Sequence, residues 1–342
     1  MTRVLLTGAS GFIATHILDI LLAHGHSVRL TVRSADKAEK LIAAHPEHKD
    51  QIDYVIVKDI AEAGAFDEAV KSDPPFEVVL HTASPFHFNV KDTKKDLLDP
   101  AINGTTGILK AIKKYAPTVK HVVVTSSFAS IIHPKEGKWP GKVYSEADWN
   151  PTTIEEADSD PTTGYRASKT LAEKAAWKFL EEEKPNFTLS TINPPLVFGP
   201  VKPYMQALES INTSNERFCN FLNGKNKEKL PANSGFVWVD VRDVAAAHVA
   251  AFEKPEAAGK RFFVVEGSNF SNQQTADIIL KHFPEYKDKL PATREENDGF
   301  DYLEGGLYTV DNSRSKEVLG LKYHSFEDCV VNTVKSLKEL GL

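Results

Sequence analysis

Short apolar runs alternate with amphipathic stretches along the first two thirds of the chain. Seven of these runs are rich in Val, Leu and Ile, as is typical of buried strands. They lie at residues 4–6, 27–32, 54–57, 77–81, 122–124, 189–193 and 261–265. Helical spacing of apolar residues follows several of them, as at 12–22 and 103–115. Strands that alternate with helices predict an α/β fold with a parallel, doubly wound sheet.

The last third of the chain has a different pattern, with helices separated by loops. Helices are expected at residues 244–252, 272–283, 313–319 and 326–340, while residues 201–236 are polar and irregular. We therefore expect a main domain formed by 1–195 and 237–266. A smaller C-terminal lobe, formed by 196–236 and 267–342, would close over a substrate.

Composition excludes several classes of protein. The chain has 342 residues, 41% of them hydrophobic, and a net charge of −6 with both signs interspersed, which argues against nucleic acid or an anionic membrane as partner. No apolar run approaches the ~20 residues that span a bilayer. The first residues lack the apolar core of a signal peptide, and Cys219 and Cys329 form no disulfide framework. These features favour a reducing, cytoplasmic compartment.

A glycine-rich turn follows the first strand, in the run Thr7-Gly8-Ala9-Ser10-Gly11-Phe12-Ile13-Ala14. Gly8 permits a tight turn, Gly11 lets the backbone approach a pyrophosphate, and Ala14 allows close packing of helix on strand. The amides at the start of the following helix attract phosphate. The run predicts a Rossmann-type dinucleotide site contacted by Gly8, Ser10, Gly11, Phe12 and Ile13, the alternative being a purely structural turn.

Basic residues follow the second strand, where an acidic residue would bind the ribose of NAD. Arg33 and Lys37 suit a 2′-phosphate and predict NADP(H), unless they form only a solvated basic loop. Further cofactor contacts are expected where the third and fourth strands end. These candidates are Asp59, Ile60, Thr82, Ala83 and Ser84. Asp59 is equally suited to capping the next segment.

Tyr165 and Lys169 are four residues apart in a stretch of good helix formers, so both side chains lie on one helix face. Thr162 and Thr163 are candidate N-caps of that helix. A nearby ammonium favours the phenolate and lowers the pKa of the phenol, which makes it a usable acid. Because such pairs are common on helix surfaces, this one gains weight only from its neighbours.

The fifth strand ends in Thr125-Ser126-Ser127, and its carboxyl end borders the crevice where α/β sheets bind ligands. Ser127 is therefore expected to converge with Tyr165 and Lys169. Together with the glycine turn, these residues resemble the extended short-chain dehydrogenases/reductases over nearly the whole chain. Further segments carry the resemblance: 81–86, 149–151, 172–177, 193–194, 197–200 and 239–244. They are most similar to the fungal methylglyoxal reductase branch, with dihydroflavonol 4-reductase and cinnamoyl-CoA reductase more distant.

The resemblance implies a role for each residue. Tyr165 would be the general acid, Lys169 would lower its pKa and hold the nicotinamide ribose, and Ser127 would bind the substrate oxygen. Ser126 also carries a hydroxyl, so spacing alone leaves the serine ambiguous, and we prefer Ser127. Asn103 is a candidate for ordering a proton relay, or else a capping residue. Further cofactor contacts would come from Thr125, Pro194, Leu196 and Val197.

The resemblance and the motifs together predict an NADPH-dependent reductase that converts an aldehyde or ketone to an alcohol without a metal. Phe86 and Phe128 are expected in the substrate pocket, with Phe198 and Trp149 as further apolar candidates. The long segment 133–163 would wall this pocket or be pinned to the core. Alternatives are a hydroxysteroid dehydrogenase, a nucleotide-sugar epimerase or a non-catalytic NADP sensor. The substrate, the stereochemistry and the oligomeric state, a homodimer among the options, are not determined.

Overall fold

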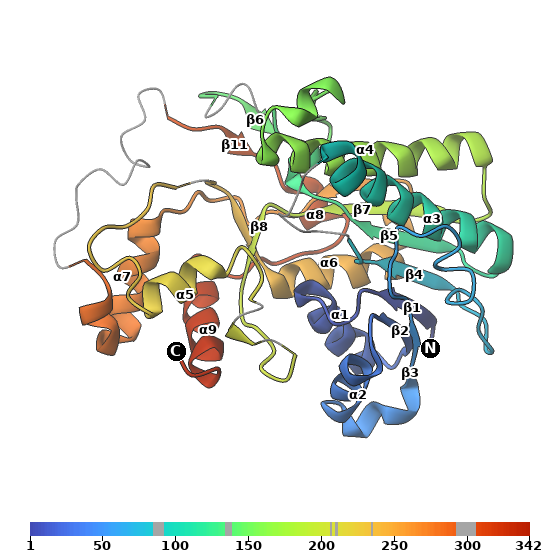
Figure 1. The fold of residues 1–342 in the computed structure, drawn as a ribbon, viewed down its shortest axis with the longest axis horizontal. Coiled ribbons are helices and arrows are strands. Elements are labelled where there is room, and N and C mark those ends of the chain that lie inside the picture. Colours follow the sequence, from blue (N-terminus) through green and yellow to red (C-terminus); the bar gives the residue numbers. More distant parts are fainter. Residues whose placement is uncertain (85–91, 134–138, 206, 209–210, 234, 292–305) are drawn as a thin grey trace.

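The computed structural model describes the chain except for residues 85–91, 134–138, 206, 209–210, 234 and 292–305. Its centre is a seven-stranded parallel sheet with the strand order β10-β7-β5-β4-β1-β2-β3 (Figure 1). The strands of this sheet are β1 (Arg3–Thr7), β2 (Ser27–Val32), β3 (Ile52–Ile56), β4 (Val78–His81), β5 (His121–Thr125), β7 (Thr188–Asn193) and β10 (Arg261–Phe263). The predicted Rossmann-type, doubly wound α/β fold is confirmed.

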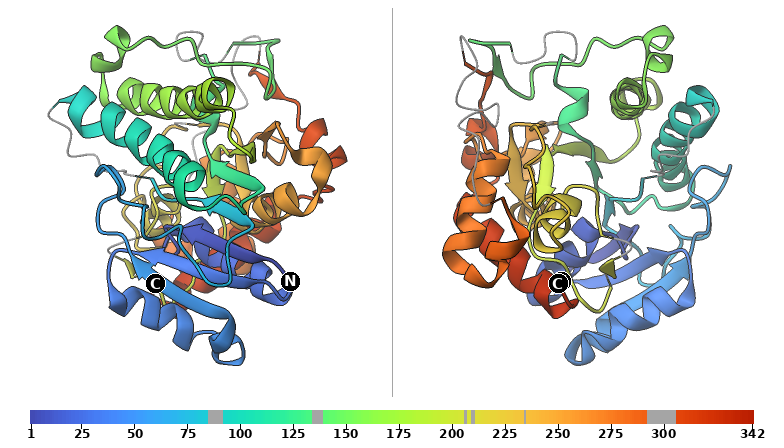
Figure 2. Two further views of the ribbon diagram at one scale, coloured as in Figure 1. Left: turned by 90° about the vertical axis from the view of Figure 1, so that its right-hand side faces the viewer. Right: turned by 60° about the vertical axis from the view of Figure 1, so that its left-hand side comes forward.

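Helices cover both faces of the sheet. One face carries α1, α2 and α6, and the other carries α3 and α4, which pack side by side (Figures 1 and 2). The α-helices are α1 (Phe12–Ala23), α2 (Ala35–Ala43), α3 (Asp99–Tyr115), α4 (Pro161–Glu183), α5 (Glu216–Leu222), α6 (Val241–Glu253), α7 (Asn272–His282), α8 (Ser313–Glu317) and α9 (Phe326–Glu339). Among the helices that the structure describes, none is both long and apolar enough to span a bilayer.

The chain reverses direction across the sheet between β1 and β4. From β1 it winds outward through β2 to the edge strand β3, and then returns to the other side of β1 to form β4. The loops that leave the carboxyl ends of β1 and β4 therefore diverge and leave a crevice. Parallel register places Thr7 opposite His81 and His81 opposite Val124, so three strands end at the same level.

The elements α5, α7 and α9 lie together beside the carboxyl-end side of the sheet (Figure 1). A short parallel pair, β8 (Leu196–Phe198) with β9 (Trp238–Asp240), connects them to the main sheet. A second pair joins β6 (Val143–Tyr144) to β11 (Thr309–Val310), so the segment after β5 is bound to the C-terminal part of the chain. The predicted division into two domains stays a prediction.

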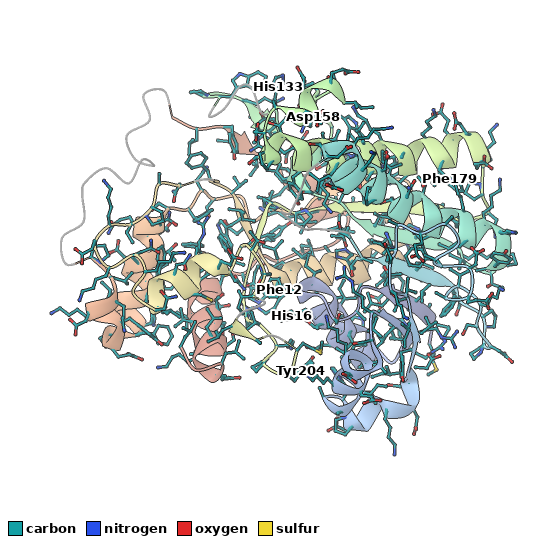
Figure 3. All side chains as sticks on the ribbon, viewed as in Figure 1. Phe12, His16, His133, Asp158, Phe179 and Tyr204 are labelled. Atoms are coloured by element: carbon teal, nitrogen blue, oxygen red, sulfur yellow. The ribbon has the colours of Figure 1, made fainter. Side chains whose placement is uncertain are left out.

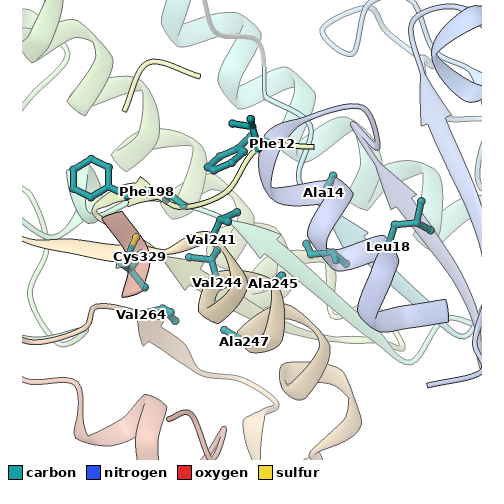
Figure 4. Close-up of a cluster of buried hydrophobic side chains, with 14 of the residues drawn as sticks. Phe12, Ala14, Leu18, Phe198, Val241, Val244, Ala245, Ala247, Val264 and Cys329 are labelled. Atoms are coloured by element: carbon teal, nitrogen blue, oxygen red, sulfur yellow. The ribbon is translucent and has the colours of Figure 1, made fainter. Parts of the chain in front are cut away.

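One hydrophobic cluster runs from the face of the sheet that carries α1 and α6 to the helices α5, α7 and α9. Ala14 on α1 packs toward α6, whose first turns contribute Val241, Val244 and Ala245 (Figure 4). Phe198 on β8 belongs to the same cluster and is fully buried. Ala14 is fully buried in this cluster, which fits the small side chain expected there from the glycine-rich run.

Most predicted elements are confirmed, and the differences include the start of α3, the segment before β9 and the end of β10. The helix expected to begin at Asn103 begins at Asp99, one turn earlier, with Pro100 in its first turn where proline is tolerated. The segment 201–236, expected to be irregular, contains the short helix α5. Residues 264–265, expected to extend the last strand, lie beyond β10.

The cap of α4 is also different from the prediction. Asp160, not Thr162 or Thr163, is the N-cap, and its Oδ1 accepts hydrogen bonds from Thr162 N (2.9 Å) and Thr163 N (3.0 Å). Pro161 occupies the first helical position, where a backbone N–H would have no acceptor within the helix, so the missing N–H of proline costs nothing. A carboxylate satisfies two amides at once and suits the positive end of the helix dipole, so it serves better here than a hydroxyl.

We predict that Asp160→Ala lowers the free energy of unfolding by about 1 kcal/mol, because two amides of α4 lose their acceptor. The same change frays the turn that precedes Tyr165, so kcat also falls. Ser325→Ala is the matched control, because Ser325 caps α9 through Asp328 N (3.2 Å). Denaturant unfolding and steady-state kinetics check both variants. Equal kcat values for the two would contradict the prediction.

Candidate active site

The three predicted catalytic side chains lie together where β5 ends beneath the first turns of α4. Tyr165 and Lys169 are one helical turn apart, with the Lys169 Nζ 6.0 Å from the centre of the Tyr165 ring. Ser127 lies two residues beyond the end of β5, and its hydroxyl is a hydrogen-bond partner of the Tyr165 phenol. Lys169 Nζ donates a hydrogen bond to Ser84 Oγ (2.8 Å), which follows β4. Two adjacent strand ends and one helix thus form the group.

The two neighbouring serines have different surroundings. Ser126 is buried, and its hydroxyl donates to Glu173 Oε2 (2.5 Å) on the α3 and α4 side of the sheet. Ser127 instead caps the short 3-10 helix η3 (Phe128–Ser130), with its Oγ accepting from Ala129 N (3.1 Å) while it contacts Tyr165. The geometry therefore favours Ser127 as the hydroxyl available to a substrate, an assignment that stays a prediction.

Burial controls the charges of the pair. Burial raises the pKa of Tyr165, and the hydrogen bond from Ser127 only partly offsets this. Burial also lowers the pKa of Lys169 to about 8. This differs from the expectation that the ammonium lowers the pKa of the phenol, because burial raises that pKa and the opposing contribution comes from Ser127 rather than from Lys169. Both side chains remain partly exposed, so they border an opening rather than a sealed core.

A cavity of about 20 Å³ lies directly behind Lys169, between α3, α4 and the ends of β4 and β5. This is enough for one water molecule. His81 lines it, and its buried Nε2 has no hydrogen-bond partner, while its Nδ1 lies 2.9 Å from Thr7 Oγ1. Burial and the Lys169 charge lower the pKa of His81 to about 3, so the ring is neutral.

The proton-relay expectation for Asn103 is wrong in position. Asn103 lies on the exposed face of α3, while Thr105, two residues later, lines the cavity behind Lys169. Successive helical positions are rotated by about 100°, so side chains two residues apart lie on nearly opposite faces of the helix. The prediction of the role rested on sequence position alone, and the helix also begins one turn before Asn103, so the face could not be assigned.

The glycine-rich turn fits a dinucleotide. Gly8 has a positive φ of 66°, and a Cβ there would lie 2.8 Å from Ala83 Cα, so any side chain would clash with the loop after β4. The N-terminus of α1 has no side-chain cap, and the first bond of this turn runs from Thr15 N to Gly11 O (3.1 Å). Gly11 N already donates to Gly8 O (2.9 Å), whereas the amides of Phe12, Ile13 and Ala14 have no acceptor among the described residues and can bind a phosphate.

Other predicted residues of the turn surround the same helix end. Gly11 is exposed, Ser10 and Ile13 are half-buried, and Phe12 is buried at the start of α1, near the centre of the molecule (Figure 3). The turn is held against the second strand by hydrogen bonds from Gly8 N to Thr31 Oγ1 and from Ala9 N to Thr31 O (both 3.1 Å). This fixes the residues that follow β2 beside the phosphate-binding amides.

Arg33 and Lys37 lie there, on the segment from β2 into α2. Both side chains are exposed, and across the described residues neither has a hydrogen bond or an ion pair. Asp59 Oδ1 accepts from Ala61 N (2.9 Å), so this carboxylate also forms a local turn. Ile60 packs against α3, where a Cβ on Gly104 would lie 3.1 Å from its Cδ1.

The remaining cofactor candidates border the strand ends. Thr82 Oγ1 donates to Thr7 O (2.6 Å), and Ala83 N donates to Thr7 Oγ1 (3.2 Å), which ties this loop to the glycine turn. The Thr125 hydroxyl lies 2.6 Å from His248 Nε2 on α6, so it already has one hydrogen-bond partner. Pro194 and Val197 are buried, while Leu196 is half-buried at the start of β8.

The predicted apolar pocket stays a prediction, and the described aromatic candidates are engaged in packing. Phe86 lies outside the described residues. Phe128 is buried and stacks on Phe263 with ring centres 4.8 Å apart, so the ring serves packing rather than an open pocket. Phe198 is fully buried, and Trp149 is covered by Arg261, whose guanidinium lies 3.6 Å from the ring centre. Aromatic residues are favoured both in cores and in pockets, which is why their identity in the sequence does not separate the two roles.

The spacing His45-x-x-His48 is only loosely typical of a metal site. His45 Nε2 lies 2.9 Å from Asp19 Oδ1, whereas His48 Nδ1 lies 2.7 Å from Gln51 Oε1. The two rings thus have separate partners.

A parallel sheet with a glycine turn, a tyrosine and lysine pair and an adjacent serine defines a class of dinucleotide-dependent enzymes. Residues 4–265 match the NAD dependent epimerase/dehydratase family, and the chain belongs to it. The resemblance to the extended short-chain dehydrogenases/reductases is thereby confirmed.

Relatives match over nearly the full length. The chain is 48% identical over 339 residues to ketoreductase azaE of Aspergillus niger, covering 98% of each chain. It is 38% identical over 338 residues to the NADPH-dependent methylglyoxal reductase GRE2 of Saccharomyces cerevisiae, covering 98% of this chain and 97% of that protein. The crystal structure of Gre2 from Candida albicans in complex with NADPH superposes with a TM-score of 0.92, at 37% identity and with 100% of both chains covered.

We predict that Arg33→Ala raises the KM for NADPH at least about tenfold and leaves the KM for NADH nearly unchanged, because only NADPH loses a charged hydrogen bond to its 2′-phosphate. Steady-state kinetics with both cofactors measure the difference. Lys40→Ala is the control, since Lys40 is an exposed cation further along α2. An equal effect of Arg33→Ala on both cofactors would remove Arg33 from the phosphate site.

Proposed function

We propose that the protein catalyses the NADPH-dependent reduction of an aldehyde or ketone to the corresponding alcohol. The observation that carries this is the group formed by Ser127, Tyr165 and Lys169 at the carboxyl end of β5, beside the crevice between β1 and β4. The names of the relatives, a ketoreductase and NADPH-dependent methylglyoxal reductases, support the same reaction and the same cofactor.

NADPH, when bound, supplies the hydride that adds to the carbonyl carbon. Its pyrophosphate would lie on the amides of the glycine turn and the start of α1, and its 2′-phosphate beside Arg33 and Lys37. Lys169 would hold the nicotinamide ribose. The absence of a side-chain cap on α1 and the unpaired state of both basic side chains among the described residues fit this placement.

Negative charge grows on the carbonyl oxygen as the carbon is reduced. Two hydroxyls, those of Ser127 and Tyr165, are near enough to each other to hydrogen-bond one oxygen between them. Such donors stabilise the developing charge because they are already oriented and partly shielded from water. Tyr165 then transfers its proton to the oxygen as general acid, and the phenolate that remains is stabilised by the ammonium of Lys169.

The charge on Lys169 is therefore essential to the mechanism. Burial alone raises the pKa of the phenol, so proton transfer from Tyr165 would be unfavourable without a compensating cation. As the phenolate forms, the attraction to the ammonium grows in a partly shielded site, and the lysine then offsets the cost of desolvation. The same ammonium can contact the ribose, since it already reaches the Ser84 hydroxyl at the strand end.

The chemistry of the site gives no substrate beyond a carbonyl compound. The epimerase alternative remains within the matched family, but the basic residues after β2 argue for exchangeable NADPH rather than retained NAD. The alternative of a non-catalytic NADP sensor does not require the serine, tyrosine and lysine to converge. A cytoplasmic location and a homodimer remain predictions from the sequence.

We predict that Tyr165→Phe lowers kcat by roughly 10²–10⁴-fold, because the proton donor is lost. Binding of NADPH, followed by its fluorescence, stays unchanged. Tyr323→Phe is the control, since Tyr323 is a half-buried tyrosine bonded to Ser315 (2.7 Å) away from the site. The substrate for these assays is identified by testing a panel of aldehydes and ketones, with chiral analysis of the products. Turnover by Tyr165→Phe at the wild-type rate would rule the mechanism out.

We also predict that kcat/KM falls as pH rises through about 8, because this parameter reports the free enzyme and Lys169 has a pKa of about 8 there. Below that pH the lysine carries the required charge, and above it the neutral amine predominates. Arginine stays charged throughout this range, so the fall in kcat/KM above about pH 8 should be absent from Lys169→Arg. A wild-type profile that stayed flat well above this pH would contradict the assignment.

A further inference from the structure

Glu173 is a buried carboxylate on α4, one turn beyond Lys169 and two turns beyond Tyr165. It points into the sheet rather than to solvent, and its side chain has no exposed surface. A charged group is rarely buried completely, because desolvation costs several kcal/mol unless other groups replace the water. The mechanism described above makes no use of this residue.

Six side chains replace the water around this carboxylate. Its Oε2 accepts from Ser126 Oγ (2.5 Å), Ser130 Oγ (2.6 Å) and Asn193 Nδ2 (2.7 Å). Its Oε1 accepts from Thr191 Oγ1 (3.0 Å), Arg261 Nε (2.6 Å) and Trp177 Nε1 (3.3 Å). Trp177 lies on α4 itself, while the other donors come from the segment after β5, from β7 and from β10, so one carboxylate joins α4 to three adjacent strands of the sheet.

The carboxylate is ionised. Burial alone would raise its pKa, but the charge of Arg261 and the hydrogen bonds from Arg261, Ser126 and Ser130 hold it below its ordinary value. The guanidinium of Arg261 is itself satisfied, since it also donates to the carbonyl oxygens of Glu146 (2.6 Å) and Asp148 (2.8 Å). Because Arg261 balances the negative charge, the carboxylate affects its neighbours mainly by holding them in place with hydrogen bonds, and less through its electric field.

Two of the donors flank Ser127 in the chain. Ser126 immediately precedes it and Ser130 lies three residues later, and both hydroxyls converge on the same Oε2. Asn193 adds a bond to Ser127 O (3.3 Å) and another to Ser130 Oγ (3.0 Å). The backbone that carries the Ser127 hydroxyl is therefore held from both sides by a group on the helix that carries Tyr165.

We propose that Glu173 is a positioning residue that fixes the Ser127 hydroxyl against Tyr165, by binding Ser126 and Ser130 to the helix that carries the acid. This rests on the proposed function. The two hydroxyls must point at one oxygen, and a misplacement of about 1 Å can cost roughly 10²-fold in rate. An apolar contact between helix and strand would tolerate sliding, whereas short hydrogen bonds to one oxygen atom do not.

The test removes single hydroxyls and leaves the buried charge and its arginine intact. We expect Ser126→Ala and Ser130→Ala to lower kcat by roughly three- to thirtyfold, with the affinity for NADPH unchanged. The isotope effect with 4-deuterated NADPH should rise, because the chemical step becomes slower than product release. Ser126→Thr should keep the wild-type kcat, since threonine retains the hydroxyl. The extra methyl group has room because residue 126 borders the small cavity behind Lys169.

Ser190→Ala is the matched control. Ser190 is a buried serine on β7 whose hydroxyl donates to Ala257 O (2.7 Å), and it takes no part in the bonds to Glu173. The control should lose a similar amount of stability, measured by thermal unfolding, with wild-type kcat. The positioning role is overturned if Ser126→Ala and Ser130→Ala show the kcat of Ser190→Ala at equal loss of stability.

Failure of this inference is distinguishable from failure of the proposed function. If Tyr165→Phe is inactive while the serine variants behave like the control, only the role of Glu173 is lost. If Tyr165→Phe stays active, the proposed function itself fails. Glu173→Gln keeps the shape of the side chain but leaves Arg261 without a counter-ion, so less of the protein should fold. With kcat calculated per NADPH-binding site, which counts only folded protein, this variant should still show a lower kcat than the wild type.

Discussion

Parallel pairing of β1, β4 and β5 is the constraint on which the rest of the structure depends. Hydrogen bonds fix Thr7, His81 and Val124 at one level of the sheet, so the three following segments begin side by side. One segment is the glycine turn, one carries Ser84 and one carries Ser127. The reversal of winding between β1 and β4 opens the crevice between them. The proposed active site is assembled from residues far apart in sequence because the sheet aligns their strand ends.

The electrostatics of the site follow from burial. Desolvation raises the pKa of Tyr165 and lowers the pKa of Lys169, so each group is shifted toward its neutral form. A neutral phenol is the correct starting form for a general acid, and a lysine with a pKa of about 8 is still charged at neutral pH. Burial thus keeps the proton on the acid until a developing negative charge on the substrate draws it away.

The polar groups around Glu173 contrast with the apolar packing elsewhere. On the other face of the sheet, α1 and α6 meet through small and branched side chains, where many weak contacts define the distance but few define the direction. Beneath α4, a fully hydrogen-bonded carboxylate links the helix to β5, β7 and β10. Such a network adds directionality, which a catalytic hydroxyl needs and a hydrophobic contact does not supply.

Sequence alone determined the order along the chain of the seven strands of the main sheet, because hydrophobic spacing depends on local geometry with fixed periods. It also identified the glycine turn, the basic residues after β2 and the pair Tyr165 and Lys169, whose spacings are local. Tertiary structure decided which face of α3 borders Lys169, where the phenylalanine rings pack, and which serine contacts Glu173. Those outcomes depend on distances between segments that the chain brings together only on folding. Adjacent residues such as Ser126 and Ser127 have the same composition and propensity, and only the strand pairing sends one hydroxyl into the interior and the other toward Tyr165.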